Sequence, residues 1–370
     1  MITINKIKLA VIGTGMAWER LHWPAIQQML DKYEVVALCN KTKSDAETFA
    51  RQNNLNSVTI YDDYNEMLER TDIDAVDVMV PISENFEVAT AVIKAGKNLI
   101  AEKPMAATLE GAKQLVDLSK QYNVKIMIAE NYRYNEENNK IRDIIRQGKI
   151  GEVVYFIQNN AADFKSQMTK DTFAAKEWRQ HPNFKGGAFL DAALHDVARM
   201  RYIFGDVDHV YAMGRPQQED FNPYMSVNTQ ILFKNGVIGQ YVYYPHGKET
   251  QKPLIGLRIF GTNGEVYLED KKSGTIYITY YDGNTESVPY TPERGYYNEL
   301  LNFYNAMMGL EDIKCTPEIE YSDVKMVFDI LKSIETKQPV KVDTEDTEQD
   351  TEYKFYTNLY ETQNDRPYLH

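Results

Sequence analysis

Short apolar runs alternate with amphipathic stretches along the first third of the chain. The apolar runs have the length of buried strands, and they predict strands at Ile7–Gly13, Glu34–Asn40, the start of TIYDDYNEML, Ala75–Val80, KNLIAEK and KIMIAE. The stretches between them predict helices at Ala17–Asp31, SDAETFARQ, the end of TIYDDYNEML, Phe86–Ala95 and Leu109–Tyr122. Continuous apolar strands separated by helices are typical of a parallel sheet covered on both faces. This region therefore predicts a doubly wound α/β fold.

The pattern changes after Gly151, where strand-like segments follow one another with little helix between them. The predicted strands are EVVYFIQNN, SVNTQILF, VIGQYVYY, LIGLRIFG, EVYLED and TIYITYY. The dipeptides that link them suit hairpin turns with positive φ; these are Asn235-Gly236, Asn263-Gly264 and Asp282-Gly283. Helices are predicted at Phe189–Phe204, Tyr297–Met308 and Ser322–Thr336. The second region therefore predicts an α+β domain with a large, mostly antiparallel sheet.

A chain of 370 residues is long enough for two domains. We place the first at residues 1–130, the second at residues 131–342, and an acidic C-terminal tail at residues 343–370. The run DTEDTEQDTE in the tail is typical of a solvated segment. The sequence YKFYTNLY after it is rich in aromatic residues and could pack on a sheet or on a partner chain.

Composition narrows the class of protein. Hydrophobic residues make up 43% and charged residues 26% of the chain, as in soluble globular proteins. The net charge of −13 argues against binding to nucleic acid or to an anionic membrane surface. Only Cys39 and Cys315 occur, and no signal-peptide pattern or membrane-length apolar run is visible. We therefore expect a cytoplasmic protein without disulfides.

The first strand ends in a glycine turn, GTGMAW, that opens a helix. Glycines in this place let the backbone turn tightly and approach a pyrophosphate, whose charge is stabilised by the helix N-terminus. We expect Gly13, Thr14, Gly15 and Met16 to bind a dinucleotide in the manner of a Rossmann fold. The third position of the usual fingerprint, normally Gly or Ala, is occupied by Trp18. Either helix and strand pack less closely there, or Ala17 takes over through a shifted turn.

The second strand ends in Asn40-Lys41-Thr42-Lys43, where an NAD site usually has Asp or Glu. Asn40 can hydrogen-bond a ribose, while Lys41 and Lys43 can accept a 2′-phosphate. This sequence leans toward NADP over NAD. The alternative is a solvated turn with two surface lysines.

The segment IAEKPMA sets Glu102, Lys103 and Pro104 at the end of the fifth predicted strand. Open α/β sheets bind ligands at the carboxyl ends of their strands, so a turn here can aim a side chain into a site. An ordinary charged turn is the other interpretation.

With GTGMAWERLHWPAI, AGKNLIAEKPMA and GGAFLDAALHDVARMRYIFG, the chain resembles the oxidoreductases grouped with glucose–fructose oxidoreductase, inositol dehydrogenase and MocA. The resemblance extends from about Lys8 to about Val342. It implies that Lys103 enters the active site and that the Lys103–Pro104 peptide is cis. Glu102 then orients Lys103 or holds the cofactor ribose.

Asp191 and His195 are four residues apart and share one face of a predicted helix. Removal of hydride from a secondary alcohol leaves a proton on oxygen, and histidine is the natural base for it. By resemblance, His195 is the base, Asp191 is its companion and Lys103 donates to the reacting oxygen. We expect Asp196 to be a helix-surface carboxylate.

Five further residues fit the family less closely. Pro81 matches a proline that lines the cofactor cleft, and Asn85 stands where the family often has histidine. Arg133 contacts cofactor or substrate, or forms a structural salt bridge. Trp178 and Arg179 cover a sugar face, or Trp178 packs in the core.

The resemblance implies an NAD(P)-dependent dehydrogenase or reductase acting on a sugar, inositol or related polyol. The alternatives are a cofactor-bound sugar sensor without turnover and an NAD-assisted glycosidase of the same fold. No metal site is expected, because the six histidines are dispersed and none has a paired partner. We expect a homo-oligomer, a dimer or a tetramer, because the second sheet is rich in aromatic residues and the family pairs such sheets.

Overall fold

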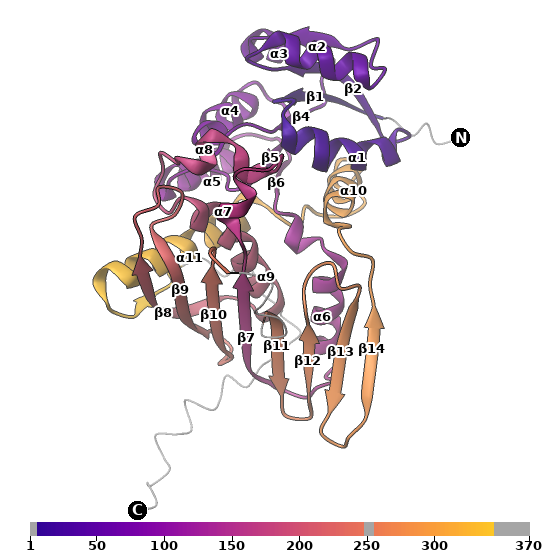
Figure 1. Cartoon of the computed structure of the whole chain (residues 1–370). Helices are drawn as coiled ribbons and strands as arrows, with labels where there is room; N and C mark the ends of the chain where they lie inside the picture. The colour runs from indigo at the N-terminus through magenta and orange to yellow at the C-terminus, as the bar shows by residue number, and fades with distance from the viewer. Residues whose placement is uncertain (1–5, 248–254, 344–370) are drawn as a thin grey trace, which may run out of the picture.

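The computed structural model describes residues 6–247 and 255–343, which fold around two β-sheets (Figure 1). Apart from Asp343, the acidic tail lies outside the described residues. No helix in the described part of the chain is both long enough and apolar enough to span a bilayer.

The first sheet has six parallel strands in the order β3-β2-β1-β4-β5-β6. The strands are β1 (Ile7–Ile12), β2 (Tyr33–Cys39), β3 (Thr59–Tyr61), β4 (Ala75–Val78), β5 (Asn98–Glu102) and β6 (Ile126–Ala129). The longer helices between them are α2 (Lys43–Gln52), α3 (Tyr64–Leu68), α4 (Ile82–Lys94) and α5 (Leu109–Gln121). Every residue of β4 and β6 is buried, because helices cover both faces of the sheet. The doubly wound prediction is confirmed.

The single helix expected at Ala17–Asp31 is instead three short pieces: the π-helical turn η1 (Trp18–His22), α1 (Trp23–Ile26) and the 3₁₀ turn η2 (Gln27–Met29). The N–H of Trp23 bonds to the carbonyl of Trp18, five residues back. Pro24 follows and has no N–H to continue the ladder. The wide turn leaves Ala17 facing a cavity and buries Trp18 against Trp23 and Phe49.

The second sheet has nine strands in the order β14-β13-β12-β11-β7-β10-β9-β8-β15. They are β7 (Val153–Ala161), β8 (Val207–Pro216), β9 (Tyr224–Phe233), β10 (Ile238–Tyr244), β11 (Gly256–Gly261), β12 (Gly264–Leu268), β13 (Thr275–Tyr280), β14 (Thr285–Pro289) and β15 (Val340–Lys341). All pairs are antiparallel except β7 with β10. The mostly antiparallel prediction is confirmed, although strands β8, β14 and β15 were not predicted.

The helical segments of this second part are η3 (Asn131–Arg133), α6 (Glu136–Arg146), α7 (Phe164–Gln167), η4 (Phe173–Ala175), α8 (Glu177–Gln180), η5 (Phe189–Ala193), α9 (Leu194–Phe204), α10 (Gly295–Met307) and α11 (Pro317–Thr336). Helices α6, α9 and α11 lie along one face of the nine-stranded sheet (Figure 1). Helix α11 begins at Pro317 and not at the expected Ser322, because proline is favoured in the first turn.

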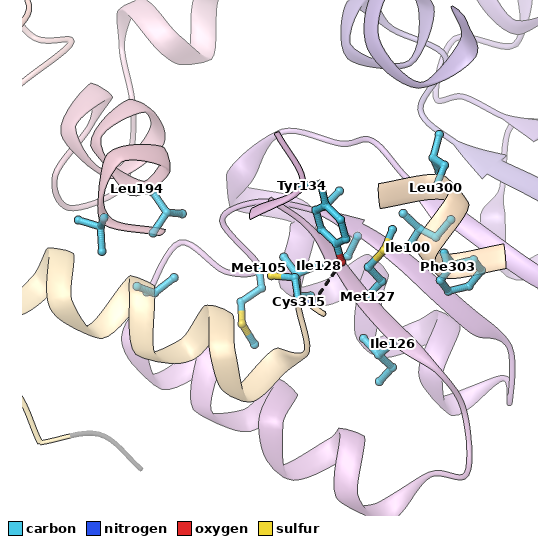
Figure 2. Packing of buried hydrophobic residues seen from close by; sticks show 14 of the residues in the cluster. Ile100, Met105, Ile126, Met127, Ile128, Tyr134, Leu194, Leu300, Phe303 and Cys315 are labelled. Carbon is cyan, nitrogen blue, oxygen red and sulfur yellow. Dashed lines mark hydrogen bonds between the residues drawn. The ribbon is translucent and has the colours of Figure 1, made fainter. Parts of the chain in front are cut away.

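Helix α10 returns from late in the chain to pack against β6 and α1 of the first part. Leu300 and Phe303 on this helix join the buried cluster that also contains Ile100 and Met127 (Figure 2). The core is therefore continuous between the two sheets.

Candidate active site

The glycine turn at the end of β1 keeps open a space that side chains would fill. Gly13 has a φ of +95°, and a Cβ there would lie 2.3 Å from the carbonyl oxygen of Met79. A Cβ on Gly15 would meet no atom within 4 Å. Gly13, Gly15 and Met16 line a large cavity, whereas Thr14 is buried and is not part of the lining. An open, glycine-lined turn at a helix start fits the pyrophosphate of a dinucleotide.

The end of β2 contributes Asn40 and Lys41 to the same cavity, but not Lys43. Lys43 begins helix α2 and is exposed. Lys41 is 79% exposed and its Nζ lies 2.8 Å from a carboxylate oxygen of Glu84. This end of the cavity carries the carboxylates of Asp62, Asp63 and Glu84. This end of the cavity therefore has more negative charge than Lys41 and Lys43 alone suggested.

The turn after β5 is held by side chains on both sides. The Lys103–Pro104 peptide is cis, as the resemblance implied. Glu102 accepts the N–H of Lys103 on Oε2 at 2.9 Å. Asn85, from α4, is buried and donates Nδ2–H to the carbonyls of Glu102 (3.1 Å) and Pro104 (2.8 Å). Asn85 thus supports the lysine-bearing turn from behind.

Lys103, Asp191 and Arg179 form one buried ionic cluster. Lys103 Nζ donates to the backbone carbonyl of Asp191 at 2.6 Å and to its Oδ1 at 3.0 Å, while Arg179 Nε donates to Oδ2 at 2.6 Å. Burial opposes ionisation of Asp191, but Lys103 and Arg179 together hold its pKa well below the usual range. Burial by itself lowers the pKa of Lys103. The negative charges of Asp191 and Glu102 outweigh this effect, so the pKa is raised overall. Two of the three ammonium donors are occupied, which leaves one for a ligand.

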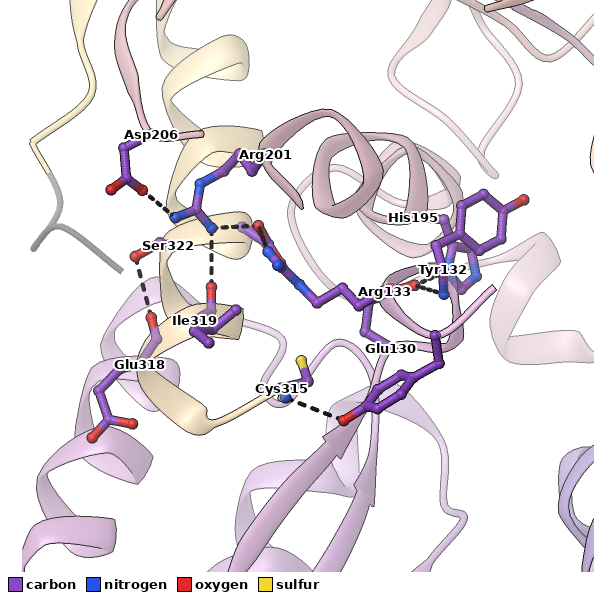
Figure 3. Close-up of polar contacts among 12 residues, drawn as sticks. Glu130, Tyr132, Arg133, His195, Arg201, Asp206, Cys315, Glu318, Ile319 and Ser322 are labelled. Atoms are coloured by element: carbon purple, nitrogen blue, oxygen red, sulfur yellow. Dashed lines mark hydrogen bonds and ion pairs between the residues drawn. The ribbon is translucent and has the colours of Figure 1, made fainter. Parts of the chain in front are cut away.

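The sequence analysis gave Asp191 as the companion of His195. In the structure, the carboxylate in contact with His195 is that of Glu130. Nδ1 of His195 lies 2.8 Å from Oε1 of Glu130, at the end of β6 (Figure 3). The ring of Tyr132 stacks on the imidazole, with centroids 4.5 Å apart and planes at 17°. Burial lowers the pKa of His195, Lys103 and Lys271 lower it further, and Glu130 raises it, with a net lowering. Glu130 and the stacked ring of Tyr132 hold this imidazole at the wall of the cavity.

These groups meet in one cavity of about 970 Å³. Of the residues predicted from the sequence, it is lined by Gly13, Gly15, Met16, Asn40, Lys41, Pro81, Glu102, Lys103, Trp178, Arg179, Asp191 and His195. Three predicted residues, Thr14, Lys43 and Arg133, are not among its lining. Residues that the sequence did not single out also line it, among them Phe173, Lys271 and Tyr296.

Arg133 and Asp196 have structural surroundings. Arg133 is buried and donates to both carboxylate oxygens of Asp323, at 2.8 and 2.7 Å, so the salt-bridge alternative describes its place. Asp196 was expected on the helix surface, and that prediction is wrong. It is 2% exposed and accepts hydrogen bonds from Asn160, Arg199 and Tyr241, because α9 turns this side toward the sheet.

A second histidine–carboxylate cluster is formed by residues that are not part of the cavity lining. His22 of η1 has Nδ1 2.8 Å from Asp77 in β4 and Nε2 3.2 Å from Glu299 in α10, and all three side chains are fully buried. Burial lowers the pKa of His22, but Asp77 and Glu299 outweigh it and raise the pKa well above 6.5. Burial raises the pKa of Glu299 to about 8, against the effect of His22. The cluster joins the first sheet to α10.

Comparison with known proteins gives two family matches that together span nearly the whole described chain. Residues 7–130 match an oxidoreductase family described by its NAD-binding Rossmann fold. Residues 142–342 match the C-terminal α/β domain of the same oxidoreductase family.

Individual proteins of known sequence or structure resemble most of the chain. An uncharacterized protein of Saccharomyces cerevisiae is 29% identical, over 89% of this chain and 96% of its own length. The 1,5-anhydro-D-fructose reductase of Ensifer adhaerens is 26% identical, over 84% of this chain and 92% of its own. A levoglucosan dehydrogenase in complex with NADH and levoglucosan shares the fold, with a TM-score of 0.81 at 21% identity, covering 92% of this chain and all of that one.

Proposed function

The chain belongs to the oxidoreductase family of glucose–fructose oxidoreductase, inositol dehydrogenase and MocA, and on this premise we propose that it interconverts a secondary alcohol and a carbonyl of a sugar, inositol or related polyol. The observation that carries the proposal is the convergence of Lys103, Asp191 and His195 on the cavity that the glycine turn also lines. The relatives named for anhydrofructose and levoglucosan support a carbohydrate substrate.

Each of the three side chains has a role that its contacts support. In the oxidation direction, Nε2 of His195 accepts the proton of the substrate hydroxyl. The remaining N–H of Lys103 donates to the same oxygen, where charge develops as the proton leaves. Asp191 holds Lys103 in place and is itself fixed by Arg179. NAD, when bound, supplies the hydride acceptor for oxidation and, reduced, the donor for the reverse reaction.

We propose NAD(H) as the cofactor in preference to NADP(H), against the lean of the sequence. The carboxylates of Asp62, Asp63 and Glu84 would repel a 2′-phosphate, and Lys41 is already paired with Glu84. The test is to measure the affinities of NADH and NADPH by fluorescence titration, for the wild type and for Lys43→Ala. Equal and small effects on both nucleotides support NAD(H), whereas a selective loss of NADPH affinity restores the NADP prediction.

The test of the proposed function is a panel of sugars, inositols and anhydrosugars, followed by cofactor absorbance with both NAD and NADP. Stoichiometric NADH formation with at least one polyol supports the dehydrogenase. Cofactor that stays bound without net reduction, together with glycoside cleavage, would show the NAD-assisted glycosidase. Binding of a sugar without either change would show a sensor.

We propose that a second copy of the chain covers the open face of the nine-stranded sheet. Alternate residues of four strands expose large apolar side chains there: Tyr155, Tyr211, Met213, Ile238 and Tyr277, at 38–63% exposure. Tyr155 and Ile238 are direct partners in the β7–β10 pair, so they lie on the same face. Light scattering at micromolar concentration is expected to give the mass of a dimer or tetramer. Ile238→Lys is expected to lower the fraction of associated chains. A monomeric wild type would refute the assembly.

A further inference from the structure

Glu130 is fully buried, and it connects the end of strand β6 in the first sheet to the side chain of His195. It directly follows β6, and its Oε1 accepts the backbone N–H of Tyr132 at 3.0 Å and lies 2.8 Å from Nδ1 of His195 (Figure 3). Its Oε2 is buried without a hydrogen-bond partner in the described part of the chain. Glu130 is absent from the cavity lining, so it reaches the cavity only through the histidine.

A carboxylate in this position fixes the state of the imidazole. A neutral imidazole has one donor and one acceptor nitrogen, and an ionised carboxylate only accepts. Nδ1 therefore carries the proton, and Nε2 keeps its lone pair. Nε2 has no partner among the described residues, and His195 lines the cavity. The stack with Tyr132 fixes the plane in which this lone pair lies.

We propose that Glu130 is a positioning residue for the reaction: it holds the Nδ1 proton of His195, turns Nε2 toward the substrate as the acceptor, and stabilises the imidazolium formed there. The inference rests on the proposed function. In oxidation, the substrate O–H bond breaks, its proton bonds to Nε2, and the positive ring then faces the negative carboxylate. In reduction, the same proton returns to the carbonyl oxygen.

Among the charged groups around His195, Glu130 is the one that favours the imidazolium. Lys103 approaches from the end of β5 and Lys271 from the β12–β13 turn, and both disfavour the imidazolium. Asp191 has its carboxylate engaged by Lys103 and Arg179. Tyr132 presents a ring face, with Lys271 on it at 5.3 Å. Glu130 is thus the carboxylate in contact with the ring, and without it the base would be too weak near neutral pH.

The test is Glu130→Gln, which preserves the shape and removes the charge. The imidazole of His195 is followed by NMR titration of the cofactor-free protein, its signals assigned by their loss in His195→Gln. We expect its titration to move to a pH lower by about 1 to 3, the usual effect of losing a contacting opposite charge. With a polyol that turns over, kcat should fall about tenfold to hundredfold, as for carboxylates that orient metal-bound histidines. The acid limb of the kcat/KM profile should move in the same direction as the titration, with NADH affinity unchanged.

Glu299→Gln is the matched control, because Glu299 is also fully buried and contacts a histidine, yet is absent from the cavity lining. It should leave the His195 titration where it is. An unmoved titration in Glu130→Gln, with wild-type kcat, overturns the inference even if the protein proves to be a dehydrogenase. Absence of any turnover in the wild type defeats the proposed function instead, and the titration still reports on Glu130. If Glu130→Gln does not fold, Glu130→Asp takes its place: a smaller move in the same direction supports the role, and none refutes it.

Discussion

His22 and His195 each contact a buried glutamate, yet their surroundings move their pKa values in opposite directions. His22 lies between two carboxylates, Asp77 and Glu299, and its pKa is raised despite burial. His195 contacts one carboxylate and faces the cations of Lys103 and Lys271, so burial wins and its pKa is lowered. Burial lowers the pKa of both imidazoles, so the charges of their neighbours decide the outcome. The first arrangement keeps a proton and joins two parts of the fold, whereas the second leaves a nitrogen free to take one.

The largest effect is expected from removing the histidine of the cavity. His195→Ala should lower polyol turnover by roughly a hundredfold to ten-thousandfold, the span for losing a general base. NADH affinity should stay near that of the wild type. The melting temperature should fall less than in a variant of the fully buried His22, because a fifth of the His195 side chain is exposed and Glu130 keeps its bond to Tyr132. Steady-state kinetics and differential scanning fluorimetry measure the two. A stable variant with wild-type kcat would remove His195 from the mechanism.

His22→Ala should show the reverse pattern. It leaves Asp77 and Glu299 buried without their partner, which typically costs about 3–5 kcal/mol of unfolding free energy. Denaturant unfolding measures this loss. The control is His209→Ala, because His209 pairs with Asp208 at the surface, 2.9 Å away, with a 43% exposed side chain. Its removal should cost less than about 1 kcal/mol. Similar losses in both variants would show that the buried cluster is not stabilising.

The buried cluster also predicts how stability depends on pH. The raised pKa of His22 gives stabilisation that is complete below about pH 6.5 and is lost as pH rises through the folded value. Glu299 acts in the same direction, because its pKa rises from 4.5 to about 8 on folding. The melting temperature should therefore fall from pH 6 to pH 9, and Glu299→Gln should flatten the fall by a few degrees. Parallel curves for wild type and variant would contradict the assignment.

The smallest effect is expected from the ring that stacks on His195. Tyr132→Leu removes an aromatic contact of about 0.5–1.5 kcal/mol, so kcat should fall about twofold to tenfold. Tyr132→Phe keeps the ring and should behave as the wild type. Equal losses in both variants would assign the effect to the phenol hydroxyl and its Lys271 neighbour, not to the stack.

Much of the fold follows from local pattern, because buried parallel strands are apolar throughout. The strand β8 escaped prediction since the polar residues Asp208 and His209 and the small Gly214 interrupt its alternation. The broken helix after the glycine turn escaped because the π-helical turn depends on how Trp18 packs on residues distant in sequence.

For the site, the sequence named the residues whose neighbours are close along the chain or shared with the family. Glu130 was missed because it meets His195 only through the fold, 65 residues away. A signal existed: like Glu102, it is a carboxylate at the carboxyl end of an apolar parallel strand, where such sheets bind ligands. The acidity around Lys41 could not be read locally, since Asp62 and Glu84 come from other segments.

Helix α10 has a consequence for folding during synthesis, because it packs on the first part of the chain but is made much later. A ribosome delivers β1 to β6 more than 150 residues before α10 emerges. Until then His22 lacks Glu299, the Tyr33 hydroxyl lacks the carbonyl of Leu300, and Ile100 lacks the side of the core that contains Phe303 (Figure 2). These groups of the first part therefore lack their partners until residues 295–307 are made. We therefore expect the part around the first sheet to reach its full stability only after α10 is made, and truncation before residue 295 removes the α10 side of its core.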